Sequence, residues 1–365
     1  MNILFVLEHY HPYIGGAETL FRDLTVRLAK LGHDITVVTT RFDNKLAKEE
    51  NYRGVRVVRV NCRNRFLFSL LSLPRVWREA GKADLIHTTT YNAALPAWLA
   101  AKLRGERIIV TFHEVWAGLW KRLPFISNLA AAAYYLFEQL LLRLPFDRYV
   151  AVSDFTRREL IANGIPAEKV VNIYNGLDYA EFAEYDHQPP EQFTFTYYGR
   201  LGISKGLDLL LPAARDFFLL HPNSRLRLII PRQPAGMYAR VRELIEELEI
   251  EKQVELLHEL PWRELLGKVA TSSCVVIPSY SEGFCFVAAE AVALGVPIVS
   301  SGQGALVETV GGRFVEMEEM AVAALTQALE RAFIKDYDYR EPPSFPLADS
   351  IEAYLPLYGS IGMIE

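Results

Sequence analysis

The chain has 365 residues, of which 51% are hydrophobic and 23% charged, and this length is sufficient for two globular domains. Its formal net charge of -5 excludes a general nucleic-acid binder, which carries a basic excess. Cys62, Cys274 and Cys285 form no C-x-x-C motif, so neither a disulfide framework nor a structural zinc site is expected. The N-terminus lacks the basic region of a signal peptide, and we therefore expect a cytoplasmic protein.

The first half of the chain alternates short apolar runs with helical segments. Residues 2–7 form an apolar run that ends in a turn, which predicts a buried strand. A helix follows, with Leu20, Leu24, Leu28 and Leu31 on one face and Gly32 as its stop. Further apolar runs, most of them separated by helical segments, lie at residues 34–40, 55–60, 84–89, 107–112, 148–153 and 170–174. Such alternation predicts a parallel sheet that is covered on both sides.

A polar segment at residues 178–192, which contains Pro189-Pro190, interrupts this alternation and is interpreted as a linker. A second series of strands follows at residues 193–199, 225–230, 253–257, 273–278 and 296–301. The fold class is therefore α/β, with two Rossmann-like, doubly wound parallel-sheet domains that face a cleft. The predicted domains are residues 1–188 and 189–345, and a last helix at about 346–362 is expected to pack back on the first.

The longest apolar stretch of the chain covers residues 123–144. Glu138 and Arg143 interrupt it, and the stretch is interpreted as a buried or interfacial helix rather than a membrane span. A peripheral membrane contact through residues 115–126 is a further hypothesis, because Trp and basic side chains suit the headgroup region. The side chains concerned are Trp116, Trp120, Lys121 and Arg122.

Glycines and cations gather at the expected carboxyl ends of two strands, where ligands bind in such sheets. Gly15-Gly16 directly precedes a helix and allows an anion to approach the backbone, although a plain tight turn explains it equally well. In "YYGRLGISKG", Arg200 closely follows a strand and Lys205 opens a helix. A planar guanidinium and an ammonium group in a glycine-rich loop favour a diphosphate site over two ordinary surface cations.

Two glutamates occupy an unusually apolar stretch, "SEGFCFVAAEAVALGVPIVSS". Glu282 lies at the turn into a helix, and Glu290 lies about two turns further along it. A helix-capping glutamate and a solvated one are the structural alternative, but alanines and a valine surround Glu290. We expect the two carboxylates to accept hydrogen bonds from two different sugars. His113, which ends a strand, is either a structural histidine or a residue of the same site.

These segments together resemble the retaining GT-B glycosyltransferases of family 4. The resemblance covers nearly the whole chain and keeps the order of the family: "GGAE", "TFHE", "VSDFTRREL", "NIYNGLD", "GRLGISKGLDLLLPA" and "VIPSYSEGFCFVAAEAVALGVPIVS". The combination of Glu-x7-Glu, a downstream Gly-x-Pro and Gly-Arg-Leu with a lysine five positions after the arginine is specific as a set. Any single one of these elements is a weak signal.

The resemblance implies a role for each of these residues. Arg200 and Lys205 would neutralise the diphosphate of the donor, and Glu282 would hold hydroxyls of the transferred sugar. Glu290 would hold the ribose, and His113 would contact the sugar near the reacting carbon. Backbone amides around Phe286 and Val287 would add to the phosphate cradle, and Gly16 would face the phosphates from the other domain. The remaining residues of the implied substrate site are Gly15, Asn175, Gly199, Gly283 and Phe284.

The implied activity is a retaining hexosyl transfer that requires no metal and no other cofactor. A UDP- or GDP-sugar is the expected donor. The acceptor would be a glycan, a lipid-linked molecule or a small molecule, and the pathway would be cell-envelope polysaccharide or glycolipid synthesis. The location would be cytoplasmic, with association to the cytoplasmic face of the membrane as a hypothesis.

Two positions depart from the family pattern, and some other functions fit the motifs less well. Cys285 and Ala305 stand where the family usually has glycine. A glycoside hydrolase needs two carboxylates that flank the scissile bond, a dehydrogenase fingerprint fails at Val307, and "DYD" at 336–338 is a poor candidate for a metal motif. A nucleotide-sugar epimerase of the same fold and a non-catalytic nucleotide-sugar binding protein remain as alternatives.

Overall fold

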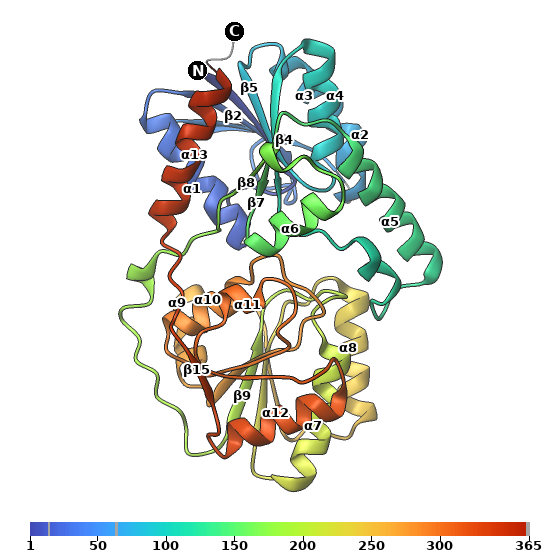
Figure 1. Cartoon of the computed structure of the whole chain (residues 1–365), viewed down its shortest axis with the longest axis vertical. Helices are drawn as coiled ribbons and strands as arrows, with labels where there is room; N and C mark the ends of the chain where they lie inside the picture. The colour runs from blue at the N-terminus through green and yellow to red at the C-terminus, as the bar shows by residue number, and fades with distance from the viewer. Residues whose placement is uncertain (14, 63–64, 363–365) are drawn as a thin grey trace. The chain divides into compact units, whose positions relative to one another are not determined.

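The computed structural model describes residues 1–13, 15–62 and 65–362, which form two α/β units (Figure 1). Unit 1 comprises Met1–Trp120, Ala132–Gly176 and Phe345–Glu365, and unit 2 comprises Lys121–Ala131 and Leu177–Ser344. Each unit has its own mainly parallel sheet, so the expected architecture of two Rossmann-like domains is confirmed.

The sheet of unit 1 has eight strands in the order β3-β4-β2-β1-β5-β6-β7-β8, and all neighbours are parallel except β3 and β4. The order places β1 in the interior of the sheet, between β2 and β5. The strands are β1 (Asn2–Val6), β2 (Asp34–Thr40), β3 (Glu49–Tyr52), β4 (Val55–Val60), β5 (Leu85–Thr89), β6 (Arg107–Phe112), β7 (Arg148–Ala151) and β8 (Val170–Asn172). Strand β3 was not predicted, because its sequence, EENY, lacks an apolar run.

Helices cover this sheet where the periodicity predicts them. The α-helices are α1 (Gly16–Lys30), α2 (Phe68–Leu71), α3 (Leu73–Ala80), α4 (Ala94–Arg104), α5 (Asn128–Arg143) and α6 (Asp154–Ala162). The 3-10 segments are η1 (Arg65–Leu67), η2 (Ala117–Lys121) and η3 (Ala167–Lys169). Helix α5 begins five residues later than the apolar stretch at 123–144, after Pro124, and Ser127 caps it by accepting the Ala130 amide at 3.3 Å.

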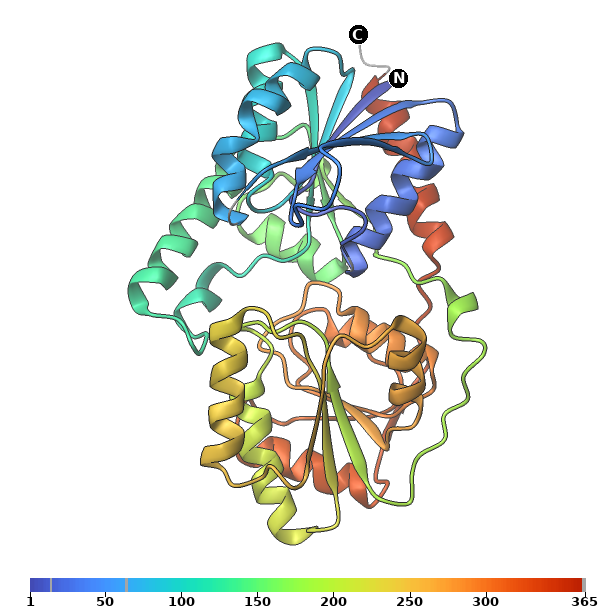
Figure 2. The ribbon, with the colours of Figure 1, turned by 180° about the vertical axis from the view of Figure 1, so that it is seen from behind.

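The last helix, α13 (Leu347–Gly362), belongs to unit 1 and lies beside α1 (Figure 2). Tyr354 and Tyr358 are fully buried in the same core cluster as β1 and α1. The Tyr358 hydroxyl lies 2.7 Å from Nδ1 of His87, whose Nε2 lies 2.8 Å from the Thr111 hydroxyl. Burial lowers the pKa of His87 to about 3, so this histidine is a neutral core residue.

The sheet of unit 2 has seven strands in the order β11-β10-β9-β12-β13-β14-β15, with only β15 antiparallel to its neighbour. The strands are β9 (Thr194–Tyr198), β10 (Arg225–Ile229), β11 (Val254–Leu257), β12 (Cys274–Ile277), β13 (Ile298–Ser300), β14 (Gly312–Glu316) and β15 (Asp338–Arg340). Strands β14 and β15 were not predicted. All three residues of β15 are exposed, so no apolar pattern marks it, and its Asp338 belongs to the "DYD" segment.

Helices α7 (Leu207–Leu220) and α12 (Val322–Phe333) lie side by side in unit 2 (Figures 1 and 2). Both are amphipathic and bury their apolar faces in the core of the unit, together with strands β9 and β10. The other helical segments of this unit are η4 (Tyr179–Glu181), α8 (Ala235–Glu247), α9 (Trp262–Ala270), α10 (Phe286–Ala293) and α11 (Leu306–Thr309).

Residues 177–188 pack with unit 2, whereas the sequence assigned them to the first domain. Phe182 is buried and lies edge-on against Trp262 of α9, with ring centroids 6.1 Å apart. The Tyr185 hydroxyl donates to the carbonyl of Arg263, and His187 lies 2.9 Å from the carbonyl of Ser272. The polar composition of this stretch does not predict such contacts. The sequence therefore set the domain boundary at its proline pair, about twelve residues after the point where unit 2 begins.

Candidate functional site

Four of the expected site residues, Gly15, Gly16, His113 and Asn175, lie in unit 1, and the other nine lie in unit 2. In both units these residues follow the carboxyl ends of parallel strands, as the sequence predicts. Each unit therefore presents its own part of the site that the motifs indicate.

The glycine-rich loop of unit 2 connects β9 with α7. Gly199 has φ +126°, a conformation that glycine adopts readily, and Arg200 after it is exposed. Gly206 has φ +70° and ends the loop at the N-terminus of α7. A Cβ atom on Gly206 would lie 2.0 Å from the carbonyl oxygen of Pro278, so only glycine allows this loop to reach the loop after β12.

This close approach brings Lys205 and Glu282 together. The Lys205 Nζ lies 2.8 Å from Oε1 and 2.9 Å from Oε2 of Glu282, although the two residues are 77 positions apart. The Ser279 hydroxyl also donates to Oε1 of Glu282, at 2.7 Å. Glu282 is only 4% exposed, so these two partners replace the water that its carboxylate loses on burial. The strand order, with β9 beside β12, produces this pair.

Tyr280 fixes the same loop and was not predicted as a site residue. Its backbone amide donates to the carbonyl of Ser204 at 2.7 Å, and its hydroxyl donates to Asp208 at 2.7 Å. Burial raises the pKa of Tyr280 and also the pKa of Asp208. Tyr280 thus contacts Ser204 before Lys205 and Asp208 after it, and these two hydrogen bonds fix the position of the loop that carries Lys205. Tyr280 and Asp208 each lie inside quoted motifs, but no spacing rule indicates that they meet.

The start of α10 lies against the end of β9. The Tyr198 hydroxyl donates to the carbonyl of Val287 at 3.1 Å, and a Cβ atom on Gly199 would lie 3.5 Å from the Val287 side chain. Phe284 is buried and Phe286 is partly buried, with their rings 5.1 Å apart in an edge-on arrangement. Gly199 therefore lies beside Val287, and Phe286 lies beside Phe284. All four residues are expected at the donor site.

Glu290 has an unusual protonation equilibrium. Burial of the carboxyl group raises the pKa of Glu290 to about 7, and the nearby Tyr198 hydroxyl offsets part of that rise. Tyr198 is itself buried, and burial raises the pKa of its phenol. Glu290 therefore changes charge near neutral pH, unlike an exposed glutamate.

Cys285 and Ala305, the two departures from the family pattern, differ in their consequences. Cys285 precedes α10 with φ +69°, a left-handed conformation in which a side chain is strained. Ala305 has an ordinary φ of -75° and its amide donates to the carbonyl of Glu282 at 2.8 Å. A Cβ atom on the preceding Gly304 would lie 2.4 Å from that carbonyl oxygen. The second departure therefore leaves the turn intact, whereas the first introduces strain.

We expect Cys285→Gly to raise the free energy of unfolding by about 1 kcal/mol, because glycine adopts the left-handed conformation without strain. Denaturant unfolding measures the change. Cys285→Ala is the matched control, since it removes the sulfur and keeps the strained Cβ atom. A glycine variant no more stable than the alanine variant would contradict this explanation.

In unit 1 the expected residues lie around the first turn of α1 and the ends of two other strands. Gly15 caps α1 and Gly16 begins it. A Cβ atom on Gly15 would lie 2.1 Å from the carboxylate of Glu18, but that flexible side chain can move aside and Gly15 has an extended φ of 179°, so this turn does not itself require glycine. His113 follows β6, and its ring lies edge-on to Phe21 of α1 at 6.2 Å. Asn175 follows β8 and is 2% exposed.

The segment at 115–126 does not present the aromatic surface expected for a membrane contact. Trp120 is 8% exposed, and its indole N–H donates to Glu138 at 3.0 Å. Trp116 is partly buried, and the centroid of its ring lies 4.5 Å from that of Trp120. Lys121 and Arg122 are exposed. The buried carboxylate of Glu138 holds the Trp120 indole inside the unit, so the proposed four-residue surface is wrong at Trp120.

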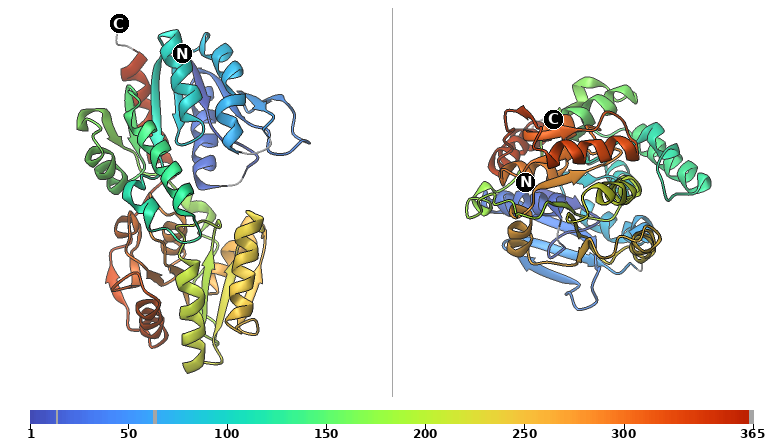
Figure 3. Two further views of the ribbon diagram at one scale, coloured as in Figure 1. Left: turned by 90° about the vertical axis from the view of Figure 1, so that its right-hand side faces the viewer. Right: turned by 90° about the horizontal axis from the view of Figure 1, so that it is seen from below.

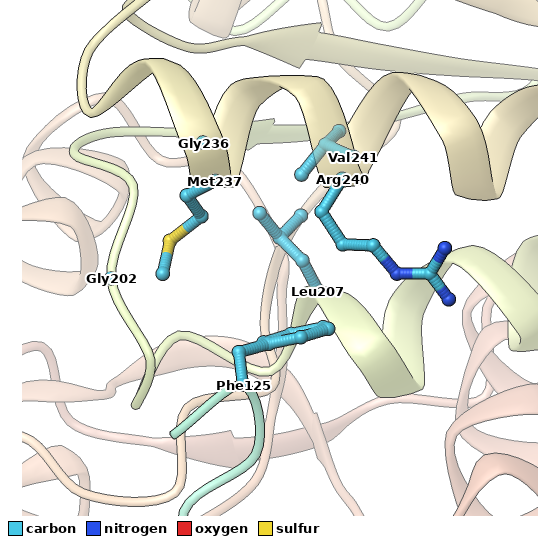
Figure 4. A pocket seen from close by; sticks show the side chains of 7 residues that line it. All are labelled: Phe125, Gly202, Leu207, Gly236, Met237, Arg240 and Val241. Atoms are coloured by element: carbon cyan, nitrogen blue, oxygen red, sulfur yellow. The ribbon is translucent and has the colours of Figure 1, made fainter. Parts of the chain in front are cut away.

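A pocket of about 280 Å³ adjoins the glycine-rich loop of unit 2 (Figure 4). Its side chains are mostly apolar, and its one cation, Arg240, forms ion pairs with Glu243 and Glu247. This pocket therefore offers no site for a diphosphate. The residues that line it are Phe125, Gly202, Leu207, Gly236, Met237, Arg240 and Val241.

The described part of the chain contains neither a metal-binding cluster nor a membrane-spanning helix. Within residues 1–13, 15–62 and 65–362, no three His, Cys, Asp or Glu side chains gather as a metal site would require. No helix among these residues has both the length and the apolar character needed to cross a bilayer.

Comparison with known families identifies both halves of the chain. The profile of Glycosyltransferase Family 4 matches residues 14–181, and that of Glycosyl transferases group 1 matches residues 181–341. The chain belongs to the group 1 glycosyltransferases of family 4. The family expected from the motifs is thus confirmed, and so is the assignment of the chain as a glycosyltransferase.

Two curated glycosyltransferases cover most of this chain. The A subunit of phosphatidylinositol N-acetylglucosaminyltransferase from Arabidopsis thaliana is 23% identical over 91% of this chain and 74% of its own. GDP-mannose:cellobiosyl-diphosphopolyprenol alpha-mannosyltransferase of Xanthomonas campestris is 25% identical over 93% of this chain and 90% of its own.

Solved structures share the GT-B fold. Sucrose-phosphate synthase of Thermosynechococcus elongatus superimposes with a TM-score of 0.77 and 19% identity, over 99% of this chain and 96% of its own. Anabaena HepE, crystallised with UDP-glucose, superimposes with a TM-score of 0.71 and 18% identity, over 99% of this chain and 100% of its own.

Proposed function

We propose that this group 1 glycosyltransferase transfers a sugar, with retention of configuration, from a nucleotide-diphosphate sugar to a lipid-linked acceptor in cell-envelope polysaccharide or glycolipid synthesis. The main observation in support of a nucleotide-sugar donor is the pairing of Lys205 with Glu282 beside a glycine-rich loop. A cation and a carboxylate held together suit a ligand that has a diphosphate next to hydroxyl groups. The UDP-glucose in Anabaena HepE supports a donor of this class.

The leaving group in this proposal is a nucleoside diphosphate. The bond between the sugar carbon and the phosphate oxygen breaks, and negative charge grows on the diphosphate. Arg200, which is exposed, and Lys205 would stabilise that charge without a metal ion. Glu282 would then exchange part of its contact with Lys205 for hydroxyls of the transferred sugar.

Retention follows if the acceptor hydroxyl attacks the face from which the diphosphate departs. A new bond forms between the sugar carbon and the acceptor oxygen, and a phosphate oxygen takes the proton that the hydroxyl loses. No protein nucleophile is then needed. His113 is proposed to contact the transferred sugar, and Glu290 the ribose of the nucleotide.

The acceptor proposal rests on the relatives. The names of the two curated enzymes specify a phosphatidylinositol and a diphosphopolyprenol acceptor, and both are lipids. A GDP-sugar is also named as the donor of the bacterial relative, so both UDP- and GDP-sugars are proposed donors. If the acceptor is lipid-linked, the transfer reaction would take place at the cytoplasmic face of a membrane.

Calorimetric titration of UDP, GDP and ADP tests the donor site. We expect one nucleotide to bind to the parent chain, and the heat of binding to disappear in Arg200→Ala/Lys205→Ala. The matched control is Arg242→Ala/Lys252→Ala, which removes two exposed cations elsewhere in unit 2. Equal binding by all three proteins, or no binding of any nucleotide, would contradict the proposed site. Acceptor-dependent release of the nucleotide then distinguishes transfer from epimerisation or mere binding.

The affinity for the nucleotide should rise with pH through about 7, the pKa of Glu290. Hydrogen bonds from ribose hydroxyls favour the ionised carboxylate, so binding below that pH must release a proton. The stability of the free protein should depend on pH in the opposite direction to the nucleotide affinity. The folded pKa is raised above the ordinary value of 4.5, so ionisation of Glu290 lowers stability as the pH rises between these values.

Calorimetry at several pH values measures the affinity in the parent and in Glu290→Gln. The titration of the diphosphate itself is common to both proteins and cancels in the comparison. We expect the additional dependence near pH 7 only in the parent. A pH dependence that is identical in the two proteins would show that Glu290 does not contact the ribose.

A further inference from the structure

A short segment at one corner of unit 1 presents large apolar side chains to solvent. It comprises η1 and α2, where Phe66 is 56%, Leu70 is 70% and Leu71 is 48% exposed. Phe68, in the middle of the segment, is fully buried in the core. The Phe68 ring thus anchors the segment, while the exposed side chains of Phe66, Leu70 and Leu71 face away from the core.

A basic pocket adjoins this corner. Its volume is about 340 Å³, and Leu71 and Pro74 contribute to its wall. Four cations and one carboxylate also line it, which leaves an excess of three positive charges: Lys48, Arg59, Arg75 and Arg78 against Glu49. The apolar corner and the cationic pocket share the side chain of Leu71, so together they form one surface.

The carboxylates near the pocket do not neutralise all of its cations. Glu79 is buried and lies 2.8 Å from Arg56 and 3.0 Å from Arg75, while Glu49 also pairs with both of these arginines. Arg59 pairs with Glu50 at 2.5 Å. Lys48 and Arg78 are exposed and form no ion pair within the described residues, and these two cations are available to an anion.

Helix α5 contacts this corner through Tyr134 and projects from the side of unit 1 (Figure 1; Figure 3, right). Phe66 stacks on Tyr134 of this helix with a centroid distance of 6.3 Å. Leu136 and Leu140, four residues apart and therefore on one face, are 66% and 46% exposed. The stretch read from the sequence as a buried or interfacial helix thus keeps an apolar face in contact with solvent.

We propose that the η1–α2 corner and its basic pocket bind the surface of an anionic phospholipid membrane. Phe66, Leu70 and Leu71 would enter the boundary between headgroups and acyl chains, and a lipid phosphate would occupy the pocket between Lys48 and Arg78. Apolar side chains beside uncompensated cations match such a boundary, because the two halves of the contact add their free energies. A soluble phosphate ligand would explain the cations but not the adjacent exposed leucines. The inference extends the proposed lipid-linked acceptor, yet it is measured without the transfer reaction.

Co-sedimentation of the full chain with vesicles tests the surface. We expect binding to vesicles of equal parts phosphatidylglycerol and phosphatidylcholine, and much weaker binding to phosphatidylcholine alone. Leu70→Ser/Leu71→Ser should lower the partition coefficient by about tenfold or more, and Lys48→Ala/Arg78→Ala should lower it by a similar factor. The matched controls lie in unit 2: Leu219→Ser/Leu220→Ser, a second exposed leucine pair at a helix end, and Arg242→Ala/Lys252→Ala.

Three results would overturn the proposal: equal binding to both vesicle types, parent-like binding by the leucine variant, or losses in the controls as large as those in the test variants. If only the cation variant loses binding and free inorganic phosphate competes, the pocket takes a soluble phosphate and the membrane proposal fails. Nucleotide titration of the same variants should be unchanged. The membrane surface and the proposed donor site can therefore fail independently.

Discussion

Replacement of Lys205 by methionine is expected to lower kcat/KM for the donor by about a hundredfold or more, because it removes a preorganised cation from the departing diphosphate. The same variant should also be less stable by about 2 kcal/mol, since Glu282 then remains buried without its counter-ion. The Lys205 ammonium is partly exposed, which keeps this loss below that of a fully buried pair.

A double variant separates these two effects. Lys205→Met/Glu282→Gln removes both charges, and the new amide oxygen can still accept the hydrogen bond from Ser279. We expect denaturant unfolding to show stability restored to within about 1 kcal/mol of the parent, while donor turnover stays low. Lys252→Met, which changes an exposed lysine of the same unit, controls for the loss of a surface charge. Recovery of both stability and turnover would show that Lys205 serves only as a counter-ion.

Glu138→Ala is expected to lower the free energy of unfolding by about 3 kcal/mol. The Glu138 carboxylate is 1% exposed and accepts four hydrogen bonds. The donors are the Tyr91 hydroxyl at 3.0 Å, the amides of Trp116 and Ala117 at 2.9 and 2.6 Å, and the Trp120 indole at 3.0 Å. Alanine leaves these donors without an acceptor, and three of them belong to the segment that follows His113.

Denaturant unfolding measures this loss, and tryptophan fluorescence follows Trp116 and Trp120 together with the three other tryptophans of the chain. Glu138→Gln should be intermediate, because an amide keeps one acceptor oxygen but turns an NH2 group toward other donors. Glu168→Ala, which removes an exposed carboxylate of unit 1, is the control and should change little. A Glu138→Ala protein as stable as this control would mean that the segment is held by its aromatic contacts alone.

Two of the three strands that the sequence missed share a physical feature. β3 and β15 lie at the edges of their sheets, and both are short and polar, with the sequences EENY and DYR. β14, GRFVE, places only two buried residues in the core. An edge strand is held mainly by backbone hydrogen bonds to a neighbour, and side-chain patterns carry little information about it. The other interior strands, buried on both faces, were predicted because their apolar runs are a direct consequence of that burial.

Glu138 illustrates the same limit within a helix. In the sequence it interrupts an apolar stretch, and nothing there distinguishes a solvated glutamate from a buried one. Its position relative to Ala131, Leu141 and Leu142, all buried, places it on the inner face of α5. The donors that make this burial favourable come from segments more than fifteen residues away. The sequence therefore offered Trp116 and Trp120 as a membrane contact, whereas the structure buries Trp120 against this carboxylate.

The sequence by itself determined the α/β class, the two mainly parallel sheets, the family and the strand ends at which Arg200, Lys205, Glu282 and Glu290 lie. These properties are local, because apolar runs, glycine turns and helix starts follow from neighbouring residues. Only the tertiary structure decided that Lys205 pairs with Glu282, that Tyr280 and Asp208 hold the loop, and that the leucines of α2 remain outside the core. Such contacts depend on which strands become neighbours and on which surfaces are left uncovered, and the packing of the whole unit settles both.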